Sequence, residues 1–212
     1  WSKTWSISYP LAMPATNTIR SIELRTINAV AYSRSPFTFA GQAHEYAGKM
    51  WQADITLKPM RRSDAEKWIT WLMSLKGQLG TFYLNDPLGC TPLGSARNSD
   101  TVTINGVTTS GNTLDIQSAP LSTTDFLKAG DYMQIGSGTS RQLFKVLQDV
   151  DTDASGTATV DVWPNVRTTI ADNAPVTFES AKGVFRLASN ETSWSVNEAS
   201  IYGITFGAVE AV

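Results

Sequence analysis

One stretch of the chain, MRRSDAEKWITWLMSLKGQLGTFYLNDP at residues 60–87, has hydrophobic residues at the period of a helix. Ser63 and Glu66 have the spacing of a capping box at its start, and Gly77 is a typical stop. We therefore expect a helix over about residues 64–76. Everything around this helix has the pattern of β-strands, which limits the chain to a mainly β fold.

The expected helix carries an apolar stripe that is too wide to stay in water. Burying each tryptophan is worth several kcal/mol, at about 25 cal/mol per Å². The stripe either joins the core or shares in a subunit interface, where tryptophan is enriched. The arginines that precede it are either a simple surface pair or donors of salt bridges between subunits. The residues assigned to core or interface are Trp51, Trp68, Trp71, Leu72, Leu75, Arg61 and Arg62.

Strand signals occupy the first sixty residues. Residues 5–9 and 50–60 alternate apolar and polar side chains at the strand period of two. Between them we expect further short strands, broken at Pro36, Gly41 and Gly48.

From about residue 89 the composition changes to Thr, Ser, Gly, Asn and Asp, with strand signals at regular intervals. Asn105-Gly106 predicts a tight hairpin. After residue 182 the chain returns to the aromatic-rich style of its beginning. We therefore predict a mainly β protein in two parts. Residues 1–88 and 183–212 form a split β-barrel host domain with one helix, and residues 89–182 form an inserted small all-β barrel or sandwich.

Composition excludes several classes of partner. Lys and Arg number 17 against 19 Asp and Glu, a net charge of −2, so a stable nucleic-acid interface is not expected. The single cysteine, Cys90, cannot form an intrachain disulfide or a cysteine-rich zinc site. No apolar run is long enough to span a membrane, and the first residues lack the pattern of a signal peptide. We expect a soluble protein made in the cytoplasm.

No catalytic constellation stands out in the sequence. His44 is the only histidine, and no Gly-x-Ser-x-Gly motif accompanies it. The acidic residues are scattered, so a hydrolase is the weakest hypothesis. No catalytic, cofactor-binding or metal-binding residue is therefore expected.

Two glycine-containing loops resemble ligand motifs only in part. Residues 151–156 match the first half of a calcium loop, but Val162 stands where a bidentate glutamate is required. Residues 136–140 lack the lysine and following helix of a phosphate-binding loop. A polar turn and a hairpin tip explain these stretches better.

Three stretches carry a family resemblance. Residues 51–87 comprise a strand, Pro-Met, a capped helix and then LKGQLGTFYLNDP. Residues 127–136, LKAGDYMQIG, and 145–167, KVLQDVDTDASGTATVDVWPNVR, add to it. Together they resemble minor tail proteins of long-tailed, siphovirus-like bacteriophages, and the architecture is most similar to the distal tail protein family.

The resemblance implies a function in the virion. It implies a β-barrel domain with one helix, and subunits that form a ring, expected to be hexameric, at the end of the tail tube, with the second domain facing outward. The chain would then be a structural protein of the tail tip, not an enzyme, that joins the tube to the distal tip or baseplate. Its partners would be further copies of itself, the tail tube protein and hub or tip proteins. A mildly acidic balance suits a ring through which DNA passes.

A carbohydrate-binding β module is the alternative function. In that hypothesis Tyr132 and Trp163, on the inserted part, are exposed platforms on which sugars stack.

Overall fold

The computed structural model describes residues 7–14 and 16–211. Over these residues the chain forms two antiparallel β-sheets and one α-helix, with short 3-10 turns between strands. The predicted mainly β class, with one helix and a second all-β unit, is confirmed. Of the strand predicted at residues 5–9, the first two residues lie outside the described part, and Ile7–Tyr9 are not in a strand.

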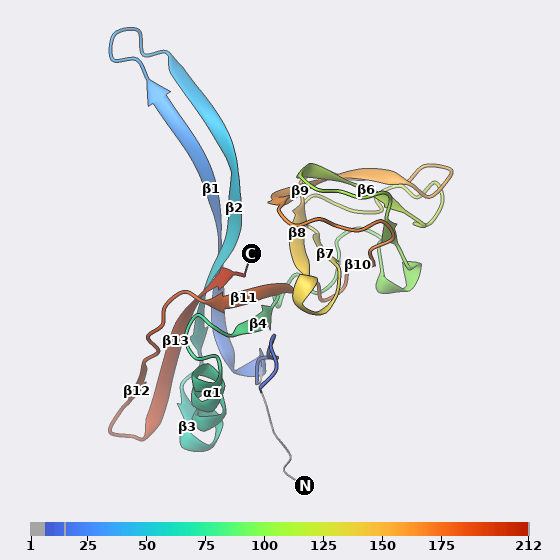
Figure 1. Ribbon diagram of the computed structural model, residues 1–212. Helices are drawn as coiled ribbons and strands as arrows, with labels where there is room; N and C mark the ends of the chain where they lie inside the picture. The colour runs from blue at the N-terminus through green and yellow to red at the C-terminus, as the bar shows by residue number, and fades with distance from the viewer. Residues whose placement is uncertain (1–6, 15, 212) are drawn as a thin grey trace.

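The host sheet combines strands from both ends of the chain. Its order is β1-β2-β13-β11-β4, and β3 and β12 also pair with β13. In the described residues this sheet is open, with β1 at one margin and β4 near the other (Figure 1). Its strands are β1 Ile19–Arg34, β2 Gly41–Leu57, β3 Met60–Arg61, β4 Thr81–Leu84, β11 Gly183–Leu187, β12 Trp194–Val196 and β13 Ile201–Glu210.

The second sheet is a nearly closed barrel. Its order is β10-β7-β8-β9-β6-β5. A bridge between Thr103 and Pro175, with Val176 N–H donating to the Val102 carbonyl at 3.0 Å, brings the two end strands together. Its strands are β5 Thr103–Ile104, β6 Gly111–Gln117, β7 Tyr132–Ile135, β8 Gln142–Val146, β9 Ala158–Val166 and β10 Val176–Thr177.

The helix α1, Arg62–Ser74, covers one face of the host sheet. Trp71 stacks edge-on against Phe82 at 5.0 Å between centroids, and Trp68 and Trp71 both contact Phe206 of β13. The Trp68 indole N–H donates to Thr18 Oγ1 at 2.9 Å, and that of Trp71 to the Ala12 carbonyl at 2.8 Å. The predicted apolar stripe therefore lies against the sheet of its own chain.

The predicted capping box does not form. The helix begins at Arg62, so Ser63 lies inside it, and Arg61 at the cap makes no side-chain capping bond. The reason is tertiary: β3 pairs with β13 through Arg61 and Ile201, which holds the chain extended up to the first helical residue. Glu66 instead pairs with Arg62 on the exposed face.

The prediction of a tight hairpin at Asn105-Gly106 is also wrong. Residues 103–104 pair with β6, and Thr108 forms a bridge with Ile170 instead of returning alongside β5. Gly106 has the positive φ of 84° that the motif provides, but its N–H donates to Asp172 Oδ1 at 2.8 Å. Contacts with residues 170–172, far along the chain, therefore hold this segment in place of a local hairpin.

Candidate functional site

The distal part of the β1–β2 hairpin, residues 27–48, is the feature that fold stability does not explain; we call it the arm. It extends well away from the other strands of the host sheet and from the barrel (Figure 1). Every residue of the arm except Ser35 is exposed, so both faces of the two strands meet solvent. Six large hydrophobic side chains are exposed there: Ile27, Val30, Tyr32, Phe37, Phe39 and Tyr46.

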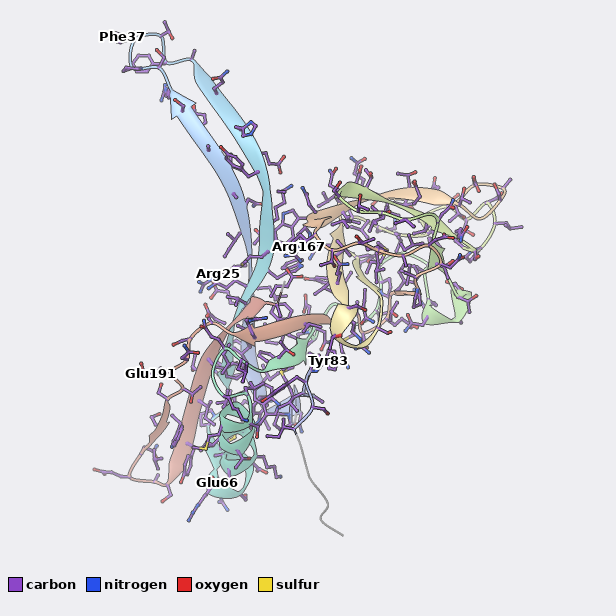
Figure 2. All side chains as sticks on the ribbon, in the orientation of Figure 1. Arg25, Phe37, Glu66, Tyr83, Arg167 and Glu191 are labelled. Carbon is purple, nitrogen blue, oxygen red and sulfur yellow. The ribbon has the colours of Figure 1, made fainter. Side chains whose placement is uncertain are left out.

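The tip of the arm is an ordered turn. Ser35 N–H donates to the Ala40 carbonyl at 2.9 Å, and Phe39 N–H donates to the Ser35 carbonyl at 3.0 Å. Phe37, which is 91% exposed, stands at the apex (Figure 2). An aromatic side chain held outward on an ordered turn is available for contact with another molecule.

Both edges of the arm offer free backbone. Strand β13 pairs with β2 only from Gln52 to Thr56, so along the arm each strand has one described neighbour, the other strand of the hairpin. Natural edge strands are usually protected by charges. The arm contains only Arg34 and Glu45 as charged residues, with His44 beside them. Its edges are therefore open to pairing with a further strand.

The barrel holds the base of the arm. The Trp163 indole N–H donates to Asn28 Oδ1 at 2.9 Å, and Arg167 Nη1 donates to the Lys49 carbonyl at 2.8 Å. Trp51 packs edge-to-face on Trp163. The arm is therefore fixed at its base and exposed beyond it.

A buried ion pair completes this junction. Glu210 accepts a hydrogen bond from Trp51 N–H at 3.0 Å and pairs with Arg167 at 2.5 Å. The Glu210 side chain is 4% exposed and the Arg167 side chain 14%. A carboxylate that is this buried needs such partners, since an unpaired buried charge is strongly destabilising.

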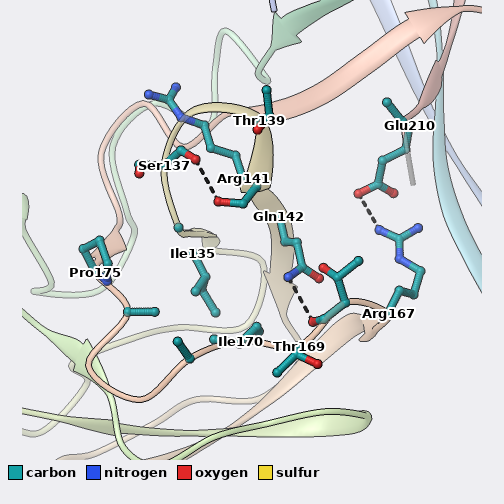
Figure 3. A pocket seen from close by; sticks show the side chains of 16 residues that line it. Ile135, Ser137, Thr139, Arg141, Gln142, Arg167, Thr169, Ile170, Pro175 and Glu210 are labelled. Carbon is teal, nitrogen blue, oxygen red and sulfur yellow. Dashed lines mark hydrogen bonds and ion pairs between the residues drawn. The ribbon is translucent and has the colours of Figure 1, made fainter.

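A cavity of about 590 Å³ lies beside the ion pair, between β8 and the loop that follows β9 (Figure 3). Gln142 Nε2 donates to the Thr168 carbonyl at 3.3 Å across it. The Arg141 guanidinium stacks on the Tyr83 ring at 4.4 Å, and that of Arg167 is held by Glu210. Hydroxyl groups and apolar side chains make up most of the remaining lining.

The predicted core or interface residues divide into two groups. Five are buried, namely Trp51, Trp68, Trp71, Leu72 and Leu75. Arg61 and Arg62 are exposed, and Arg62 pairs with Glu66 four residues along the helix. The apolar members therefore belong to the core of their own chain.

The two residues predicted as sugar platforms are not exposed as expected. Tyr132 is 6% exposed, and its hydroxyl donates to Asp86 Oδ2 at 3.2 Å. Burial, together with the nearby Asp86 carboxylate, raises the pKa of Tyr132 above its usual value. Trp163 is half-buried against Trp51. Both face the junction because this side of the barrel packs on the host sheet.

The other sequence candidates are dispersed. His44 lies on the arm, edge-on to Tyr46. Asp153 accepts hydrogen bonds within its own turn, from Ser155 N–H and Thr157 N–H at 2.8 Å each and from the Thr157 hydroxyl at 2.7 Å. Those bonds lower its pKa to about 2, with the Thr157 contacts the largest cause. Among the described residues, no group of three His, Cys, Asp or Glu side chains could hold a metal ion.

Sequence patterns did not identify the arm. Strand breaks are predicted at Pro36, Gly41 and Gly48. Pro36 lies in the turn between β1 and β2, and Gly41 is the first residue of β2, but Gly48 lies inside this 17-residue strand. Two features of residues 27–48 could have indicated the arm. Charged residues are scarce there, and apolar residues occupy both odd and even positions, so both faces of a strand would be apolar.

The fold and arm together define a mainly β protein with a protruding hairpin. No protein-family model matches the chain, and a search of curated proteins finds no match either. No helix in the described part is both long and apolar enough to cross a membrane.

Proposed function

We propose that this protein is a structural component of a bacteriophage tail tip, whose copies assemble into a ring, of order six by the resemblance, that joins the tail tube to the distal tip or baseplate. The observation that carries the proposal is the arm, which exposes apolar side chains on both faces and free backbone on both edges. A monomer gains no stability from such an element, whereas an assembly can bury it.

Ring assembly requires two different surfaces that fit one another, because a ring closes by head-to-tail contacts. The two strands of the arm offer unlike edges, one on β1 and one on β2. In the proposal, the tail tube protein and hub or tip proteins contact the two ends of the ring, no enzymatic activity is involved, and the protein resides in the virion after synthesis in the host bacterial cytoplasm.

Light scattering coupled to size-exclusion chromatography, with negative-stain microscopy, tests the assembly. Wild-type protein should form discrete rings as concentration rises. A variant with Phe37, Phe39 and Tyr46 all changed to Ser should remain monomeric with an unchanged melting temperature, because these side chains are exposed. The matched control changes Val107 and Leu121, exposed on the barrel, to Ser.

A wild-type protein that stays monomeric at high concentration, and that also fails to bind purified tail tube protein, would contradict the proposal. A tape-measure gene beside the gene for this chain would support the assignment to a phage tail.

A further inference from the structure

An apolar groove runs along the outer edge of β1 at the base of the hairpin; we call it the edge groove. It encloses about 610 Å³ between the start of β1 and the loop at residues 86–88. Ile22 and Leu24 of β1 form one wall, and Pro87 and Leu88 form the other. Leu88 is 96% exposed.

The backbone of β1 is free along this groove. In the described residues, β1 pairs with β2 on one side and with no strand on the other. Every second residue of an antiparallel edge strand directs its N–H and C=O groups away from its partner. The edge groove therefore offers a row of backbone donors and acceptors beside apolar walls, which is what an added strand requires.

We propose that the edge groove of one copy receives the arm of a second copy, with the outer edge of β2 lying along β1. This inference rests on the proposed function and names the surface that receives the arm. The outer edge of β2 is the edge that β13 covers at the base of the hairpin and leaves free along the arm. The β1 strand of the receiving copy would then pair with β2 of the arm on the same side as β13 does at the base of the hairpin.

The size of the arm supports a second copy as the occupant. Four aromatic side chains of about 200 Å² each, all more than half exposed, present roughly 500 Å². A stable interface buries about 800 Å² on each partner, so these rings supply more than half of it. A contact between two copies would bury the exposed rings of the arm and the apolar walls of the groove at the same time.

The low charge of both surfaces is compatible with the same pairing. The arm carries one anion, Glu45, which already pairs with Lys49, and one cation, Arg34. The groove has one cation at its rim, Arg20. The groove anion, Asp86, already accepts a hydrogen bond from Tyr132. Few charges would have to be desolvated when the two surfaces meet.

Cysteine cross-linking locates the contact. In a Cys90→Ser background, which removes the single native thiol, Tyr46→Cys protein is mixed with Leu88→Cys protein and oxidised. Peptide mass spectrometry should find a disulfide between positions 46 and 88 of different copies. Tyr46→Cys mixed with Leu121→Cys, on the barrel, is the control and should give no such product.

A second variant measures the energy of the contact. Leu88→Asp should weaken self-association at least about tenfold, since it places a carboxylate in an apolar contact. Leu121→Asp should leave self-association unchanged. Rings that form without the 46–88 disulfide, and that tolerate Leu88→Asp, would overturn the edge groove as the receiving surface while leaving the proposed function intact. Wild-type protein that never associates would overturn the edge groove as the receiving surface, and it would overturn the proposed function as well if it also failed to bind purified tail tube protein.

Discussion

Trp51 of β2 and Trp163 of β9 meet edge-to-face across the junction of the two sheets, with ring centroids 4.6 Å apart and ring planes at 87°. Trp51 is buried, and its indole N–H donates to the Leu143 carbonyl of the barrel at 3.1 Å. The pair therefore joins the base of the arm to the second sheet. How firmly the barrel is held on the host sheet depends on this contact and on the ion pair behind it.

Replacing Trp163 by Ala should destabilise the protein by about 1–3 kcal/mol, below the 3–5 kcal/mol typical of a fully buried ring because Trp163 is half-buried. Chemical denaturation followed by near-ultraviolet circular dichroism measures the loss. Trp194→Ala is the control, since Trp194 is 40% exposed on β12 and should cost no more than about 0.5 kcal/mol. Equal effects of the two changes would show that the Trp51–Trp163 contact contributes little.

Replacing Glu210 by Gln should cost about 2–4 kcal/mol, because the amide still accepts from Trp51 N–H but leaves the Arg167 guanidinium without its carboxylate. Thermal unfolding at neutral pH measures the change. Glu66→Gln, which breaks the exposed pair with Arg62, should change stability by less than about 1 kcal/mol. A Glu210→Gln protein as stable as wild type would mean that water replaces the ion pair without cost.

The predicted inserted domain, expressed as residues 89–182, should fold by itself. It has its own apolar core, which includes Phe126, Phe144 and Phe178, and its sheet is nearly closed. Dispersed amide resonances and a cooperative thermal transition would support the predicted division into domains. A segment that remains unfolded, although the whole chain folds, would show that the barrel needs the host sheet.

The helix and its buried face could be predicted because both depend on local periodicity. Trp68 and Leu72 recur at helical spacing, and no competing signal lies between them. The start of the helix could not be predicted, since the pairing of Arg61 with Ile201 joins positions far apart in the chain. Local patterns also could not show which side of a barrel strand packs on the host sheet, and so Tyr132 was expected to be exposed.

The arm shows why glycine can mislead. A Cβ added at Gly41 would lie 2.4 Å from the Tyr32 hydroxyl oxygen, and one at Gly48 would lie 3.2 Å from Ala29 Cβ. Gly41 begins β2 and makes room for the Tyr32 ring across the hairpin, whereas β2 continues through Gly48. A glycine in a strand marks either a break or a close approach, and only the partner strand distinguishes the two.

The turn around Asp153 should weaken in acid over a window set by that carboxylate. Its pKa is about 2 in the folded protein, against about 3.9 for an unfolded aspartate. Because the folded pKa is the lower one, the stabilisation is fully present above about pH 4 and is lost as pH falls through about 2. Amide chemical shifts of Ser155 and Thr157 should titrate with a midpoint near pH 2.

Thr157→Val should shift the midpoint of the Asp153 titration upward. The change removes the hydroxyl that donates to Asp153 Oδ2 but keeps the backbone N–H that donates to Oδ1. The carboxylate then has one fewer donor, so its midpoint should move upward while the turn still forms at neutral pH. Ser110→Ala, at an exposed side chain outside these bonds, should leave the midpoint in place. An unchanged midpoint in Thr157→Val would mean that the two backbone N–H groups alone hold the Asp153 pKa low.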